Sequence, residues 1–407
     1  MRKPDILGLL MACALLLAGC GGGSASSSNT SSSGTTTSSS SDTNVQTIVI
    51  DSGPSEAGGT VNEPFVSVTI CAPSNPSNCQ TIDHVLVDTG SYGLRIISSV
   101  LSSSLALPQQ TDVNGNAIVE CTMFADGYSW GPIKTVNMQI AGETASALPM
   151  QVIGDPTYNS LVPTNCSGTG VAENSVATFG ANGVLGVGPF AQDCGAGCAQ
   201  NADPGWYYAC NSSSCQSTAI SLAQQVQNPI TLFATDNNGV IIGLPSISVS
   251  GATSVSGTMT FGVGTQSNNG LGSARVYTLD PSTGYFKTKY NGVTYPDSLL
   301  DSGSNGLFFN DSTIAQCSGG WYCPASTLNL SADHIGLNGT SGTVSFSVGN
   351  ENVLLNNASI VASSLLAGTN GDASGFDWGL PFFFGRNVYT VIEGKSTAGG
   401  VGPYAAY

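Results

Sequence analysis

The sequence predicts an all-β protein with two similar lobes, and three observations support this. A short motif occurs twice: Val85–Leu94 and Ser298–Leu307 both read apolar-apolar-Asp-Thr/Ser-Gly-Ser, followed by a second glycine and a leucine. The 52 glycines, with many serines and threonines, separate short stretches of alternating apolar residues, which is typical of strands joined by tight turns. About 360 residues follow the N-terminal segment, enough for two lobes that each bury a core.

The first residues are typical of a targeting segment. Arg2 and Lys3 precede an apolar stretch, residues 6–17, that is too short to span a membrane as a helix. Small residues then lead to Cys20, the pattern of a bacterial lipoprotein processing site. We therefore expect residues 1–19 to be a signal peptide and Cys20 to carry lipid. An ordinary secretory signal with a chance cysteine is the alternative.

Residues 20–44 are nearly all Ser, Thr and Gly and predict a flexible tether that holds the folded part off the membrane. Because Gly21 rather than Asp follows the cysteine, the expected location is the outer membrane, on its periplasmic or cell-surface face. No second segment approaches membrane-spanning length, so the lipid is the only membrane contact we expect. The net charge of −16 argues against nucleic acid and anionic lipid as partners. We expect a monomer without a cofactor or a bound metal.

The N-terminal lobe is expected over residues 45–235 and begins with two strands, Val45–Asp51 and Phe65–Ile70. A loop bounded by cysteines then leads to the first Asp strand. Further on, Phe124–Gly131 is predicted to form a glycine-bounded hairpin tip that carries aromatic side chains. Gly183–Gly188 is predicted to be a buried strand whose glycines permit close approach of a neighbouring backbone.

The chain then crosses to a C-terminal lobe, expected over residues 236–407. Ser221–Gln227 is one of the few helix candidates, and strands are predicted at residues 230–233 and 240–244. Tyr285–Val293 is predicted to be a hairpin with an Asn-Gly turn that leads directly into the second Asp strand.

Ten cysteines remain once Cys13 is removed with the signal peptide and Cys20 is lipidated. An even number in an extracytoplasmic setting predicts disulfides. Their spacing favours four groups: Cys71 with Cys79, Cys317 with Cys323, Cys194, Cys198, Cys210 and Cys215 among themselves, and Cys121 with Cys166 as the remaining pair. A zinc site in the four-cysteine loop is the alternative.

The two Asp motifs resemble those of the pepsin-like aspartic peptidases, and Tyr389–Glu393 resembles the closing segment of that family. The resemblance implies a bilobal pepsin-like fold, with two β-barrel-like lobes and a cleft between them. It also implies that Gly183–Gly188 crosses beneath the first Asp turn. The second such strand is expected at Gly379-Leu380-Pro381, where the family pattern is altered.

The resemblance also implies the site. Asp88 and Asp301 correspond to the catalytic pair, which activates a water molecule. The residues that would support them are Thr89, Gly90, Ser91, Ser302, Gly303 and Ser304. Of these, Thr89 and Ser302 would hydrogen-bond across the lobe junction, and Ser91 and Ser304 would donate to the outer carboxylate oxygens. The family's flap tyrosine falls near Phe124, with Tyr128 as the nearest substitute.

The expected function is a membrane-anchored extracytoplasmic aspartic endopeptidase that acts on polypeptide substrates. Tyr92 and Asn305 depart from the residues more usual after the motif serine, so the chain is interpreted as a divergent bacterial lipoprotein branch of the superfamily. The alternative is a catalytically inactive pepsin-like lipoprotein that binds peptide or glycan at the cell surface. His84 and His334 are the only histidines and are expected to be packed or surface residues.

Overall fold

The computed structural model describes residues 43–202 and 205–407. The expected signal peptide, Cys20 and nearly all of the tether lie outside these residues. In the described part, regular structure is almost entirely β, with four helices of four or five residues each. None of the helices in this part is long and apolar enough to cross a membrane. The prediction of an all-β protein is confirmed.

The strands of the first half are β1 (Val45–Ile50), β2 (Phe65–Ala72), β3 (Asn75–Asp88), β4 (Tyr92–Ile97), β5 (Ala117–Met123), β6 (Gly127–Ile140), β7 (Glu143–Ile153), β8 (Val171–Ala172), β9 (Gly183–Val187), β10 (Tyr207–Cys210) and β11 (Cys215–Ser217). Those of the second half are β12 (Gly239–Leu244), β13 (Val255–Phe261), β14 (Val276–Thr278), β15 (Phe286–Tyr290), β16 (Val293–Leu300), β17 (Leu307–Phe308), β18 (Leu328–Ile335), β19 (Ser341–Val348), β20 (Ala367–Gly368), β21 (Gly375–Trp378), β22 (Arg386–Val391), β23 (Ser396–Thr397), β24 (Gly400–Val401) and β25 (Tyr404–Ala406). The α-helices are α1 (Thr164–Ser167), α2 (Val176–Phe179), α3 (Ala196–Gln200) and α4 (Glu351–Leu354).

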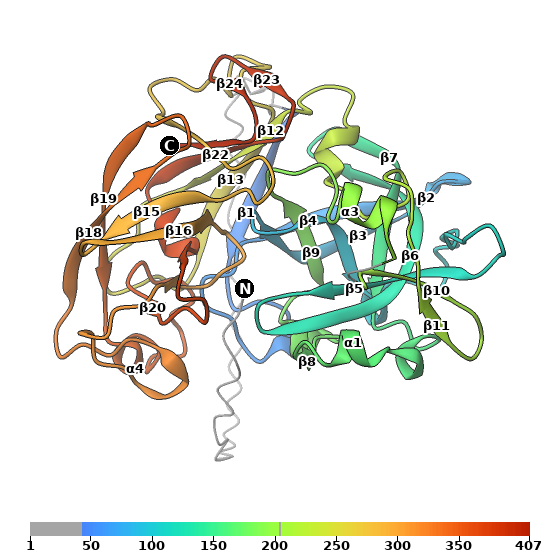
Figure 1. Ribbon diagram of the computed structural model, residues 1–407, viewed down its shortest axis with the longest axis horizontal. Helices are drawn as coiled ribbons and strands as arrows, with labels where there is room; N and C mark the ends of the chain where they lie inside the picture. Colours follow the sequence, from blue (N-terminus) through green and yellow to red (C-terminus); the bar gives the residue numbers. More distant parts are fainter. Residues whose placement is uncertain (1–42, 203–204) are drawn as a thin grey trace, which may run out of the picture.

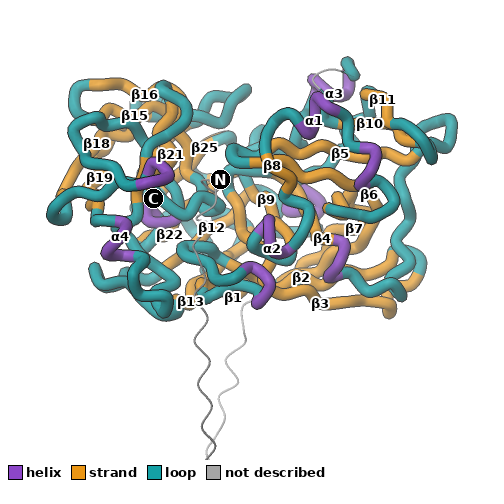
Figure 2. The backbone as a smooth tube through the Cα atoms, turned by 90° about the horizontal axis from the view of Figure 1, so that it is seen from below, coloured by secondary structure: helices purple, strands orange, loops and turns teal. Residues whose placement is uncertain are grey.

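The strands form two lobes that lie side by side, with the first half of the chain in one and most of the second half in the other (Figure 1, Figure 2). A long sheet runs through the first lobe and continues through β1, β13, β12, β22 and β25. A second sheet of seven strands, from β15 to β21, belongs to the other lobe. Strand β1 pairs with β13 along its full length, from Val45↔Thr260 to Ile50↔Val255, so the N-terminal strand joins the two halves.

The same crossing occurs once in each half, and it positions the two Asp turns. Strand β9 pairs in parallel with β3 and antiparallel with β4, so it lies between the two strands that flank the first turn. Strand β21 does the same between β16 and β17 at the second turn. A Cβ atom on Gly186 would lie 2.5 Å from the Tyr92 nitrogen, and one on Gly379 would lie 2.1 Å from the Gly306 oxygen. Both crossings therefore require glycine.

The position expected for the second crossing strand was wrong by a few residues. Leu380–Phe382 forms a 3₁₀ helix, and the crossing strand is Gly375–Trp378, immediately before Gly379. The strand was hidden in the sequence because an aspartate, Asp377, occupies one of its buried positions. An aspartate within an apolar run is a poor strand signal when its partner is far away in the sequence.

Two local predictions and one about the core also need correction. Residues Ser221–Gln227 form turns rather than a helix, and Pro229–Leu232 is a 3₁₀ helix rather than a strand, because Asn228 caps it through the Ile230 N–H. The lobes do not have separate cores. The largest buried cluster includes Val87 of the first lobe and Phe376 of the second, because the sheet through β1, β13, β12 and β22 connects them.

The ten cysteines of the described residues form five disulfides. They are Cys71–Cys79, Cys121–Cys166, Cys194–Cys198, Cys210–Cys215 and Cys317–Cys323. The four cysteines of the loop pair as two short-range bridges, which leaves no free thiol there for zinc.

Candidate active site

The site is built from the two turns that follow β3 and β16. Asp88 ends β3 and is 5% exposed, and Asp301 directly follows β16 and is 1% exposed. Each carboxylate accepts one hydrogen bond from the backbone two residues on: Gly90 N–H at 2.7 Å and Gly303 N–H at 2.9 Å. Two buried carboxylates at the ends of apolar strands are thereby partly compensated for the loss of water.

Each motif serine donates to the aspartate of its own turn. Ser91 Oγ lies 2.5 Å from Asp88 Oδ2, and Ser304 Oγ lies 2.9 Å from Asp301 Oδ2. These are the contacts that the family resemblance implied for the two serines. Each aspartate therefore accepts one hydrogen bond on Oδ1, from the glycine N–H, and one on Oδ2, from the serine, and the two bonds fix the orientation of its carboxyl group.

The two turns are joined across the lobe junction by their second residues. Thr89 Oγ1 donates to the Leu300 carbonyl at 2.9 Å and accepts from the Ser302 N–H at 2.9 Å. Ser302 Oγ in turn donates to the Val87 carbonyl at 2.7 Å and accepts from the Thr89 N–H at 3.1 Å. Four buried hydrogen bonds therefore fix the relative position of the two turns, as expected for Thr89 and Ser302.

The glycines of the motifs allow the carboxyl groups to meet. A Cβ atom on Gly90 would lie 2.7 Å from Asp301 Cγ, and one on Gly303 would lie 2.7 Å from Asp88 Cγ. Each carboxyl group thus packs on the backbone of the opposite turn, and the two interact by a side-chain hydrogen bond. The turns place the pair in contact, which satisfies the condition for sharing one proton.

The pair is electrostatically unequal. Burial and the charge of Asp301 raise the pKa of Asp88 to about 7. Burial acts to raise the pKa of Asp301, hydrogen bonds from Asp88, Ser304 and the Gly303 N–H act to lower it, and the net shift is downward. Below about pH 7, Asp301 is therefore the ionised member and Asp88 holds the proton.

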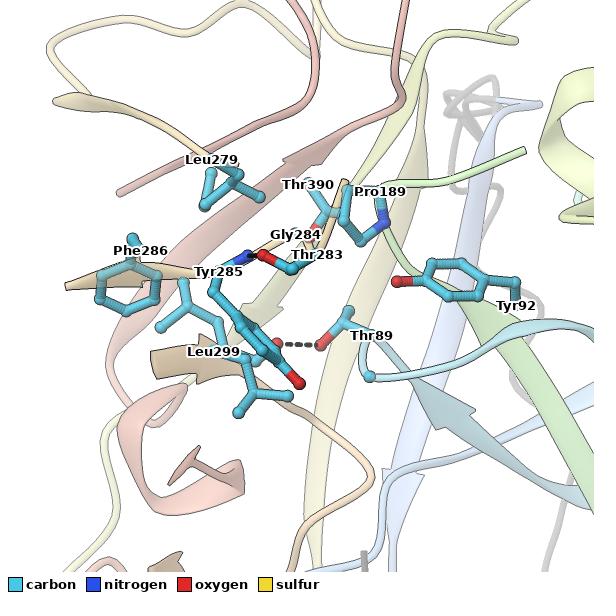
Figure 3. Close-up of a pocket in the computed structure, with 13 residues that line it drawn as sticks. Thr89, Tyr92, Pro189, Leu279, Thr283, Gly284, Tyr285, Phe286, Leu299 and Thr390 are labelled. Carbon is cyan, nitrogen blue, oxygen red and sulfur yellow. Dashed lines mark hydrogen bonds between the residues drawn. The ribbon is translucent and has the colours of Figure 1, made fainter. Parts of the chain in front are cut away.

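Two adjacent cavities lie at the site. One, of about 110 Å³, is lined by both aspartates and by Met123, Phe124 and Trp206 of the first lobe. The other, of about 230 Å³, is drawn in Figure 3 and lies between Thr89 and Tyr92 on one side and Tyr285 and Leu299 on the other. Gly90 and Tyr92 line both cavities, and apolar and aromatic residues contribute much of each lining.

The hairpin β5–β6 brings Phe124, not Tyr128, to the site. The turn closes through a hydrogen bond from the Phe124 N–H to the Gly127 carbonyl, and Phe124 lines the cavity beside the two aspartates. Tyr128 is 7% exposed and packs with Trp130 and the Cys121–Cys166 disulfide behind the hairpin. Phe124 therefore presents an apolar surface without a hydroxyl to the cavity.

A buried ionic cluster beside the smaller cavity was not anticipated. Arg95 is 1% exposed and contacts Glu120 at 2.7 Å and Asp193 at 3.0 Å, and Tyr207 donates to Asp193 at 2.7 Å. Burial and the nearby Glu120 raise the pKa of Asp193 well above its ordinary value. The available signal was a single arginine within the apolar strand Tyr92–Ile97, which requires a buried partner.

A third acid beside the pair was also missed. Asp377 in β21 is 2% exposed, and its Oδ2 lies 2.6 Å from Ser304 Oγ, the same hydroxyl that contacts Asp301. The only signal was an aspartate between the buried aromatic residues Phe376 and Trp378.

The remaining candidate residues do not form a metal site in the described residues. The one group of three possible ligands is Cys317, Cys323 and Glu351, and its two cysteines are bonded to each other. His84 contacts Asp51 at 3.3 Å near the surface. His334 is fully buried, and its Nδ1 lies 2.6 Å from the Tyr407 hydroxyl. Neither histidine reaches the aspartates, in agreement with their interpretation as packed or surface residues.

A family model described as "Protein of unknown function (DUF3443)" matches residues 40–407. The chain belongs to this family. No curated protein matches the sequence. Among solved structures, an aspartic proteinase from Irpex lacteus is similar, with a TM-score of 0.50 and 17% sequence identity, over 89% of this chain and 96% of that chain. This DUF3443 protein therefore has a pepsin-like fold, with barrel-like sheets in two lobes, as predicted.

Proposed function

We propose that this protein is an aspartic endopeptidase that hydrolyses peptide bonds with a water molecule activated by Asp88 and Asp301. The observation that carries the proposal is the complete and unequal pair: two contacting, buried carboxyl groups whose pKa values are shifted in opposite directions. An acid and a base side by side are what peptide hydrolysis needs. The similarity to the Irpex lacteus enzyme supports the fold alone, because the identity is low.

In this proposal, the two roles follow from the directions of the pKa shifts. Asp301, ionised, takes a proton from water, and the water oxygen bonds to the carbonyl carbon of the substrate. Asp88, protonated, gives its proton to the carbonyl oxygen, so the intermediate is neutral at both oxygens. Asp301 then gives its proton to the leaving nitrogen as the C–N bond breaks, and Asp88 takes a proton from one of the two hydroxyls as the carboxylic acid product forms, which restores both groups. The two adjacent cavities would hold the polypeptide on either side of that bond.

The pH profile follows from these directions. Activity requires Asp301 ionised, so the acid limb lies below the ordinary aspartate range of about pH 4. It also requires Asp88 protonated, so activity falls as the pH rises through about 7. We expect a broad optimum on the acid side of neutrality.

The test is to incubate the purified full chain with a denatured protein from pH 3 to 8. A peptide that carries a tetrahedral secondary alcohol in place of the scissile bond serves as inhibitor. Cleavage with the expected profile, blocked by the alcohol, supports the proposal. Binding of the alcohol peptide without any cleavage of substrate would instead favour the second candidate function, an inactive protein that binds peptide. The presence of Phe124 at the hairpin, without a hydroxyl, also favours this second candidate.

We further propose that the enzyme is a bacterial lipoprotein, anchored through Cys20 at the outer membrane with the tether between lipid and folded part. The support is the sequence around Cys20 and the composition of residues 20–44. The change Cys20→Ala should release the protein from the membrane fraction with its fold intact. If the variant still sediments with membranes after a high-salt wash, lipid at Cys20 does not hold it.

A further inference from the structure

The two halves of the site differ at one buried position. Val87 and Leu300 each precede an aspartate of the pair, and the crossing strands pair Val87 with Leu185 and Leu300 with Trp378. Val184, which precedes Leu185, and Asp377, which precedes Trp378, therefore occupy equivalent positions in the two halves. Val184 is apolar and 1% exposed. The first turn therefore has an aspartate and a serine, whereas the second has an aspartate, a serine and a second acid.

The hydrogen bonds at Ser304 require more protons than the serine has. Its hydroxyl lies 2.9 Å from Asp301 Oδ2 and 2.6 Å from Asp377 Oδ2, both hydrogen-bonding distances. Two such bonds need two protons, and a hydroxyl supplies one. One of the two carboxyl groups must therefore carry the other proton and donate it to the serine oxygen.

The surroundings decide which group carries it. Asp301 also accepts the Gly303 N–H, a contact that favours the carboxylate. The second oxygen of Asp377, Oδ1, is buried and has no hydrogen-bond partner among the described residues, an arrangement that is costly for a carboxylate and tolerable for the carbonyl oxygen of an acid.

The charges around Asp377 point the same way. The carboxyls of Asp301 and Asp88 face it, and the phenol of Tyr285 lies within electrostatic range. From the flanking strand β17, the paired residues are apolar, Leu307 and Phe308. No basic side chain of the described residues forms an ion pair with Asp377. Burial, followed by the charge of Asp301, raises the pKa of Asp377 well above its ordinary value.

We propose that Asp377 is a positioning residue, a neutral carboxylic acid that donates to Ser304 and so directs the serine hydroxyl onto Asp301. The chain of bonds runs from the Asp377 acid to the Ser304 oxygen, and from the Ser304 proton to the Asp301 carboxylate. It stabilises Asp301 as the ionised base and leaves the shared proton on Asp88. The first turn, with Val184, has no such support for its serine. The role in turnover rests on the peptidase function proposed above; the protonation states do not.

Two substitutions separate the donor from the charge. Asp377→Asn keeps an N–H donor toward Ser304 and carries no charge. Asp377→Val installs the residue of the first half and removes the donor. We expect Asp377→Asn to keep kcat within a few-fold and the acid limb of the kcat/KM profile in place. We expect Asp377→Val to lower kcat and to move the acid limb up by about one pH unit, because Asp301 loses support for its charge.

The opposite assignment makes a different prediction. If Asp377 were ionised in the active enzyme, both substitutions would remove a negative charge beside the pair. Both would then move the acid and alkaline limbs together to lower pH. That result, or an unchanged profile in Asp377→Val, would overturn the proposal.

A second measurement does not depend on activity. Infrared difference spectra of the full-length protein at pH 6 distinguish protonated from ionised carboxyl groups. The spectrum of Asp377→Asn should lose a protonated carboxyl band and keep the carboxylate bands of the wild type. Loss of a carboxylate band in Asp377→Asn would refute the assignment even if Asp377→Val does not fold. If the wild-type protein cleaves nothing, the proposed function fails, and these spectra still decide the state of Asp377.

Discussion

Replacement of Asp88 by asparagine is expected to abolish catalysis while it raises the stability of the folded protein near neutral pH. The amide oxygen can still accept the Gly90 N–H, now at 2.7 Å, and its NH₂ can donate to Ser91 Oγ once the hydroxyl turns to accept. It cannot give a proton to the carbonyl oxygen of a substrate. We expect kcat to fall by about 100- to 10,000-fold, the usual contribution of a general acid, with the fold unchanged.

The stability effect has a sign and a size. The pKa of Asp88 rises from 3.8 to about 7 on folding, so the folded state binds more protons than the unfolded state between these values. The stabilisation is fully present below about pH 3.8 and is lost as the pH rises through about 7. A shift of about three units, at about 1.4 kcal/mol per unit, amounts to about 4 kcal/mol. Asparagine does not titrate, so relative to wild type the variant should gain up to about 4 kcal/mol between pH 4 and pH 7.5.

The assay is urea unfolding of wild type and Asp88→Asn at both pH values, beside turnover of a peptide substrate. The comparison across pH cancels any constant effect of the substitution. Asp301→Asn is the matched control: it should also stop turnover, but its stability relative to wild type should change much less between the two pH values, because a pKa lowered on folding confines the contribution of Asp301 to pH values below about 3.8. A stability difference for Asp88→Asn that does not depend on pH, or a change of equal size in both variants, would refute the reasoning. So would full turnover in either.

Other predictions concern groups away from the pair. Arg95→Met should destabilise the protein by about 3–5 kcal/mol in urea unfolding, because it leaves the buried Glu120 carboxylate without its cation; a loss below 1 kcal/mol would contradict that. Burial lowers the pKa of His334 to about 3. Between pH 6.5 and 3 the unfolded chain therefore binds a proton that the folded protein does not, and the free energy of unfolding falls by up to about 1.4 kcal/mol per pH unit as the pH is lowered. His334→Gln should therefore flatten the acid side of the stability curve, and an unchanged slope would show that this histidine does not limit acid stability. Replacing Cys121 and Cys166 by alanine should cost about 4 kcal/mol by loop entropy, measured as the change in unfolding free energy, and no change would mean that the bridge does not constrain the unfolded chain.

Much of the site could be predicted from the sequence because the Asp motif occurs twice. The two motifs carry the aspartates, glycines and serines in the same order, and each serine contacts the aspartate three residues before it. Local contacts of this kind depend on spacing along the chain, so they can be predicted without knowledge of the fold. The first crossing strand could also be predicted, because its apolar residues and glycines occur together in Gly183–Val187.

Tertiary structure decided the rest. Sequence spacing alone could not show that Asp377 lies beside Ser304, 73 residues away, or that Arg95 meets Asp193, 98 residues away. It also could not show that Phe124 faces the cavity while Tyr128 packs behind the hairpin. The two aspartates are alike in sequence and accept matching glycine and serine donors, yet in the folded structure the pKa of Asp88 is raised and that of Asp301 is lowered. The sequence determined which acids meet; burial and the hydrogen bonds of distant strands decided which one holds the proton.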